Sequence, residues 1–136
     1  MLISLIFLKT SLSPFFPWII HKINLTWSIE LSEEYQHPAL LLVDGVSSIC
    51  ALDLRTDEWG VDVALAGSQK ALSLPTGLGI VCAGPKALEA SKNAKSLTVF
   101  FDWSDRLKFY KLGAYWPYTP SIHLFYGLRA ALDLIF

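Results

Sequence analysis

The sequence predicts an α/β fold, in which helices flank a mostly parallel sheet. Three short apolar runs, each followed by glycine or by an Asp-Gly pair, have the composition of buried strands; they cover residues 39–43, 61–66 and 78–83. Helical patterns follow them and alternate with polar connections. The spacing of roughly ten to twenty residues suits a mainly parallel sheet in which one strand lies close in sequence to its neighbour, and the sequence leaves open whether that strand is parallel or antiparallel.

Two of the predicted strands lead directly into candidate functional residues. The first run ends at Asp44-Gly45, and small apolar residues and a polar connection follow it. The second run opens the loop from Gly67 to Gly77, which contains Lys70 and Pro75. An acid and a lysine therefore each follow an apolar strand, and the carboxyl ends of parallel strands meet at one edge of a sheet.

The remaining elements are predicted to be helices, apart from a short strand or extended piece at residues 97–101. Pro85 opens a helix to about Lys92, because proline is favoured in the first helical turn. Residues 102–111 form a second helix. Ser121 is a suitable N-cap for a third, which reaches Phe136 without a terminating glycine, so we expect the chain to be truncated within it.

Residues 1–35 have no sustained helical or strand period, so this apolar segment stays unassigned and is expected to be poorly ordered. Hydrophobic residues make up 53% of the chain and charged ones 17%, which fits either membrane association or a core-rich piece of a larger protein. A membrane span is disfavoured, because Leu2–Ile20 is interrupted by a lysine and two prolines and falls short of about 18 uninterrupted apolar residues.

The charge and the cysteines limit the possible partners. A net charge of -1 without a basic run argues against nucleic-acid binding. No metal site is expected. Cys50 and Cys82 lie in apolar sequence, which predicts buried, reduced thiols and a reducing intracellular compartment.

Lys70 and Asp44 each have an ordinary alternative. Most loop lysines are solvated surface residues, and a strand-ending Asp-Gly is common turn chemistry. A lysine at the end of a buried strand can instead be desolvated, which lowers its pKa and favours Schiff-base formation. Paired with a carboxylate for the pyridine nitrogen, such a lysine meets the needs of pyridoxal phosphate.

Three stretches of the sequence carry a family resemblance: VDGVSSICALD, DEWGVDVALAGSQKALSLPTGLGIVCA and YWPYTPSIHLFYGLRAALDLI. They resemble the serine–glyoxylate and alanine–glyoxylate aminotransferases, fold type I enzymes that use pyridoxal phosphate, and the plant peroxisomal members most of all. The resemblance implies that residues 36–136 are the central part of the cofactor-binding large domain. Cysteine desulfurases, a competing family, usually place histidine before the lysine, so Gln69 favours the aminotransferases.

The resemblance also implies a set of site residues. Lys70 would be the Schiff-base lysine and the acid/base of the proton shift. The other cofactor-binding residues would be Asp44 at the pyridine nitrogen, Val46 at the ring face, Ser68 and Gln69 near the phosphate and ring oxygen, and Thr119 at the phosphate of the neighbouring subunit's cofactor. The family's tyrosine upstream of that threonine falls at Trp116, with Tyr115 and Tyr118 close by. The resemblance therefore leaves open which of these three aromatic residues contacts the phosphate.

The implied reaction is amino transfer from serine or alanine to glyoxylate, giving glycine, in a homodimer resident in the peroxisome. The chain departs from the family at residues 1–35, lacks the Gly-rich phosphate loop and has no carboxylate-binding arginine, for which Arg129 is no candidate. It also ends without a peroxisomal tripeptide, so a cytosolic location stays open. A catalytically inactive fragment, a cysteine desulfurase-like enzyme and a membrane-associated fragment are the alternatives.

Overall fold

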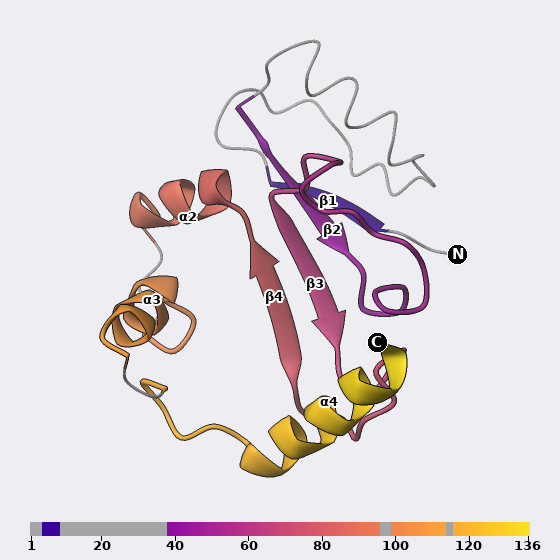
Figure 1. Ribbon diagram of the computed structural model, residues 1–136. Coiled ribbons are helices and arrows are strands. Elements are labelled where there is room, and N and C mark those ends of the chain that lie inside the picture. The colour runs from indigo at the N-terminus through magenta and orange to yellow at the C-terminus, as the bar shows by residue number, and fades with distance from the viewer. Residues whose placement is uncertain (1–3, 9–37, 96–98, 114–115) are drawn as a thin grey trace.

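The fold is taken from a computed structural model, which describes residues 4–8, 38–95, 99–113 and 116–136, with residues 4–8 as backbone only. A four-stranded sheet in the order β1-β2-β3-β4 occupies the centre (Figure 1). Helices α2, α3 and α4 follow the sheet in the sequence. The predicted α/β class is therefore confirmed.

The sheet is mixed. β2 (Leu40–Asp44) and β3 (Val63–Gly67) run parallel, with Asp44 opposite Leu65. β4 (Gly79–Ala83) pairs with β3 in the antiparallel direction, which answers the question that the sequence left open for the third strand. The parallel pair places the carboxyl ends of β2 and β3 side by side.

The first strand comes from the segment that the sequence left unassigned. Ser4–Leu8 form β1, which pairs antiparallel with β2 so that Ser4 lies opposite Asp44. The sequence left these five residues unassigned, and the structure describes them as a strand. Their apolar run alternates too little to show the two-residue period of a strand, and main-chain pairing to the edge of β2 defines the strand instead. The rest of residues 1–35 lies outside the described part of the chain.

The predicted helices are present as α2 (Pro85–Lys92), α3 (Trp103–Lys111) and α4 (Ile122–Ile135). Asp102 caps α3 by accepting a hydrogen bond from the backbone N–H of Ser104 at 2.8 Å, and this bond lowers the pKa of the Asp102 carboxyl. Ser121 occupies the N-cap position of α4, but its side chain makes no capping hydrogen bond. None of the helices in the described residues is long and apolar enough to cross a membrane.

The segment predicted as a strand or extended piece at residues 97–101 is described only from residue 99 onward. Residues 99–101 form a bend and turn that leads into α3. Val99 and Phe101 are each more than 70% exposed there, so this apolar segment is not part of the core.

The core lies against β2 and β3. Buried apolar side chains from both strands pack with partly buried ones from the connection between them; the set is Leu41, Val43, Val61, Ala64, Ile49, Leu54 and Trp59. β4 is more open, with Val81 48% exposed.

The prediction of buried cysteines is wrong. Cys50 and Cys82 are both free and exposed. Cys82 lies on the open strand β4, and Cys50 lies in the turn after β2 with a φ of 70°. An apolar neighbourhood in the sequence therefore did not translate into burial at either position.

Candidate active site at the carboxyl ends of the parallel strands

Asp44 and the loop that carries Lys70 lie at the same edge of the sheet. Asp44 is the last residue of β2, and Lys70 follows the end of β3 by three residues. The N–H of Gly45 donates to the carbonyl oxygen of Leu65 at 2.9 Å, which holds the two strand ends together. Figure 1 shows that α4 crosses below this edge. The structure therefore brings the predicted acid and the predicted lysine loop together.

The Asp44 carboxylate is half-buried and oriented by its own turn. Its Oδ1 accepts a hydrogen bond from the N–H of Val46 at 3.0 Å, which is a typical Asp turn interaction. The turn is closed by the N–H of Ile49, which donates to the carbonyl oxygen of Gly45 at 2.9 Å. A Cβ at Gly45 would lie 2.5 Å from Cγ1 and from Cδ1 of Ile49, so a side chain there would force the side chain of Ile49 to move. Gly45 therefore lets Ile49 pack closely against the turn that aims Asp44.

Gly67 forms the floor of a small cradle between the two loops. A Cβ built on Gly67 would lie 3.2 Å from Cγ1 of Val46 and 3.2 Å from Oε1 of Gln69. These two predicted site residues come from different strand ends and converge over the bare backbone of the glycine. Together with Asp44, they form a contiguous group at the edge of the sheet.

Ser68 is fully buried and holds the lysine loop closed. Its hydroxyl donates to the carbonyl oxygen of Pro75 at 2.8 Å and accepts from the N–H of Leu78 at 3.2 Å. Its backbone N–H also donates to the carbonyl oxygen of Leu78, and its carbonyl accepts from the N–H of Leu74. Ser68 thus ties both ends of the Lys70 loop together from the inside.

We expect Ser68→Ala to destabilise the cofactor-free protein by about 1–3 kcal/mol, the usual effect of leaving a buried polar group unpaired. The substitution removes the bond to Pro75 and leaves the N–H of Leu78 without its serine partner. Urea unfolding monitored by circular dichroism measures the change. Ser73 is an exposed serine in the same loop, so Ser73→Ala serves as the control. Equal stability of the two variants would show that the hydroxyl of Ser68 does not stabilise the closed loop.

Lys70 is exposed, and the turn fixes its backbone. Its N–H donates to the carbonyl oxygen of Gly67 at 3.4 Å, and its carbonyl accepts from the N–H of Ser73 at 2.9 Å. The desolvation predicted from the buried strand is not observed, because the strand ends at Gly67 and the described residues beyond it leave the lysine open to solvent. The site presents an exposed lysine after the end of β3 and a half-buried carboxylate at the end of β2.

The loop rests on α4 through two glycines. A Cβ at Gly77, whose φ is 129°, would lie 3.1 Å from Cδ1 of Leu124. A Cβ at Gly127 would lie 3.2 Å from Cδ2 of Leu74. Each glycine lets a leucine from the opposite element approach its backbone. The final helix therefore supports the Lys70 loop from below, a role that the sequence did not indicate.

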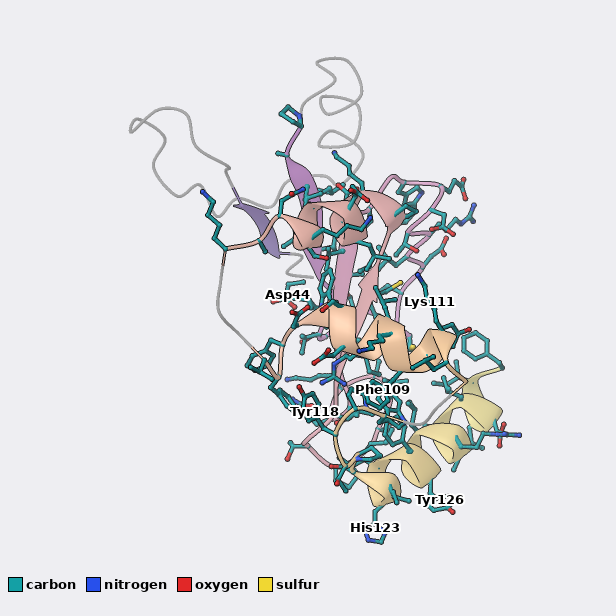
Figure 2. The ribbon with its side chains drawn as sticks, turned by 90° about the vertical axis from the view of Figure 1, so that its left-hand side faces the viewer. Asp44, Phe109, Lys111, Tyr118, His123 and Tyr126 are labelled. Atoms are coloured by element: carbon teal, nitrogen blue, oxygen red, sulfur yellow. The ribbon has the colours of Figure 1, made fainter. Side chains whose placement is uncertain are left out.

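Thr119 stands apart from this group, on the connection between α3 and α4, and is exposed. Trp116 packs against Phe125 of α4, with ring centroids 5.3 Å apart. Tyr118 lies beside α3 (Figure 2) and directs its hydroxyl to the carbonyl oxygen of Val99 at 3.2 Å. Tyr115 lies outside the described residues. The described contacts therefore link Asp44, Val46 and Gln69 with the Lys70 loop, and none of these contacts involves Thr119.

Arg129 is occupied elsewhere, because its guanidinium pairs with Asp133 one helical turn away at 2.9 Å. The groups that sequence reasoning missed are Gly45, Gly67 and the hydroxyl lock of Ser68. For the two glycines the sequence signal was weak. A glycine after a strand predicts a turn, but only the fold shows which side chain lies close to its backbone.

Comparison with known proteins places these residues in context. Residues 29–135 match the family described as aminotransferase class-V. Serine–glyoxylate aminotransferase of Arabidopsis thaliana is 84% identical over 106 residues, which cover 78% of this chain and 26% of that protein. L-aspartate–glyoxylate aminotransferase of Paracoccus denitrificans is 52% identical over 100 residues, covering 74% of this chain and 25% of that protein.

The fold has a close counterpart among solved structures. The crystal structure of alanine–glyoxylate aminotransferase from Nostoc sp. matches with a TM-score of 0.71 and 31% identity, over 82% of this chain and 29% of that one. The chain thus spans about a quarter of the length of the curated relatives it matches, such as the 26% covered in the Arabidopsis protein.

Proposed function

Because this chain belongs to the class-V aminotransferase family, we propose that the protein carrying it uses pyridoxal phosphate to transfer an amino group from serine or alanine to glyoxylate. The supporting observation is the placement of Asp44 and the Lys70 loop at the carboxyl ends of two neighbouring parallel strands. Ligands of open α/β sheets bind at such an edge.

The groups present at the edge suit the proposed cofactor. A half-buried carboxylate, an accessible primary amine and a bare glycine backbone flanked by two side chains are what a protonated pyridine ring with an aldehyde requires. When bound, pyridoxal phosphate supplies an electron sink that stabilises negative charge at the α-carbon of the amino acid.

The residues would divide the work as follows. The carboxylate of Asp44, already oriented by the N–H of Val46, would keep the pyridine nitrogen protonated. Nζ of Lys70 would hold the cofactor and then carry the α-proton of the substrate. Val46 and Gln69 would contact the ring from the Gly67 cradle. Ser68 would shape the Lys70 loop, and Thr119 would contact the cofactor phosphate of a neighbouring subunit.

Serine is the proposed first donor, since the Arabidopsis protein, 84% identical over the matched residues, is a serine–glyoxylate aminotransferase. The Paracoccus relative uses L-aspartate by its name, so the donor varies among proteins that share this region. We further propose a homodimer and residence in the peroxisome, on the strength of the family resemblance to plant members.

The test is a pair of measurements on the purified protein. Titration with pyridoxal phosphate should give the absorption band of a cofactor bonded to a lysine. Addition of serine, alanine or aspartate should then remove that band, and glyoxylate should restore it with formation of glycine. Cofactor binding without any amino transfer would favour the alternative of an inactive fragment, and absence of the band would refute the proposal.

A further inference from the structure

A cluster of five residues joins the start of α3 to the segment that carries Thr119. Its members come from residues 99–100, the first turns of α3 and the connection to α4; they are Val99, Phe100, Asp105, Arg106 and Tyr118. We call this set the Arg106 clasp. None of these residues belongs to the group at the carboxyl ends of β2 and β3.

Arg106 is the central member of the clasp. Its guanidinium carbon lies 5.2 Å from the ring centroid of Phe100 and 6.0 Å from that of Tyr118, and the two rings are 5.3 Å apart. Its Nη2 also donates to the carbonyl oxygen of Phe100 at 3.3 Å. A planar cation over two aromatic faces, anchored by a hydrogen bond, restrains both rings at once.

The hydroxyl of Tyr118 completes the clasp. It lies 3.2 Å from the carbonyl oxygen of Val99 and 3.5 Å from Oδ2 of Asp105. A phenol has a single O–H donor, and here that donor serves the chain itself. Tyr118 is therefore held at its ring and at its hydroxyl, immediately before Thr119.

We propose that Arg106 is a positioning residue, which holds Tyr118 and thereby sets the place of Thr119 on the connection that leads into α4. The proposal rests on the proposed function, in which Thr119 contacts a cofactor phosphate. It also assigns Tyr118 a role within the chain, so that an aromatic contact to the phosphate would come from Trp116 or Tyr115. In this proposal Arg106 acts only through its contacts with Phe100 and Tyr118.

The first test measures the clasp without any cofactor. Arg106→Leu should speed amide hydrogen exchange at Asp102 and Leu124, whose N–H groups donate to the carbonyl oxygens of Val99 and Ser121 on either side of the clasp, by about threefold to tenfold, the range expected from losing a cation–π contact and its packing. Arg129→Leu is the matched control, because it removes an exposed arginine from α4 and should leave these amides unchanged. Equal exchange in both variants would overturn the proposal.

The second test separates positioning from a general loss of structure. Arg106→Leu should weaken binding of pyridoxal phosphate by about threefold to tenfold and leave binding of pyridoxal, which has no phosphate, unchanged. The double variant Arg106→Leu/Thr119→Val should bind pyridoxal phosphate as tightly as Thr119→Val alone, since both changes act on one contact. An unchanged affinity for pyridoxal phosphate, or an equal loss for both ligands, would overturn the positioning role.

Two further variants keep the test decisive if Arg106→Leu folds poorly. Arg106→Lys keeps the charge without the planar guanidinium, and Tyr118→Phe keeps the ring without the hydroxyl; both should give smaller effects in the same direction. If the unaltered protein binds no pyridoxal phosphate, the proposed function fails, and amide exchange alone then decides whether the clasp exists.

Discussion

Asp44→Asn is expected to lower kcat/KM by about 10²- to 10⁴-fold, because the loss of one member of a desolvated charge pair costs roughly 3–5 kcal/mol and each 1.36 kcal/mol is about tenfold. The carboxylate is half-buried at the end of β2, and asparagine has no charge to keep the pyridine nitrogen protonated. The fold should survive, since the amide oxygen of asparagine can still accept the N–H of Val46 that Oδ1 of Asp44 accepts at 3.0 Å.

Steady-state kinetics with serine and glyoxylate measure the loss, and thermal unfolding of the cofactor-free protein checks the fold. Asp57→Asn provides the control, because Asp57 is exposed in the connection between β2 and β3. Asp44→Glu tests placement: it keeps the charge on a longer side chain and should recover part of the activity. Full activity in Asp44→Asn would remove Asp44 from the site.

The sheet was predictable from composition wherever strands are buried. The runs at residues 39–43, 61–66 and 78–83 lack polar residues apart from Asp62, and turns bound them, so β2, β3 and β4 follow within two residues of expectation. β1 could not be predicted in the same way, because its register depends on the hydrogen-bonding edge that β2 offers.

The site divides along a similar line. The positions of Asp44 and Lys70 after two strands could be predicted, because a polar residue at or after the end of an apolar run is visible in the sequence. The exposure of these side chains could not be predicted, because burial depends on which other elements cover a residue. Lys70 and both cysteines are exposed, although each lies in or after an apolar run. The lock formed by Ser68 depends on contacts seven and ten residues away, which no local pattern specifies.

The order of these residues along the chain explains why a short segment can hold the chemistry. One strand–connection–strand unit places a carboxylate and an amine at a single edge, and the register of β2 and β3 sets their separation. The turn at Gly45 and the loop closed by Ser68 then orient each group independently. We therefore expect that the acid and the amine can be substituted one at a time without loss of the fold.

Lys70→Ala is expected to abolish the lysine-bound cofactor band and to lower turnover by at least about 10³-fold, because both the bond to the cofactor and the proton carrier are lost. The side chain of Lys70 is exposed, so the free energy of unfolding of the cofactor-free protein should change by no more than about 0.5 kcal/mol. Lys95→Ala, another exposed lysine, should leave band and turnover intact. A small primary amine added to Lys70→Ala should restore part of the turnover by carrying the proton. Retention of the band in Lys70→Ala would mean that a different lysine binds the cofactor.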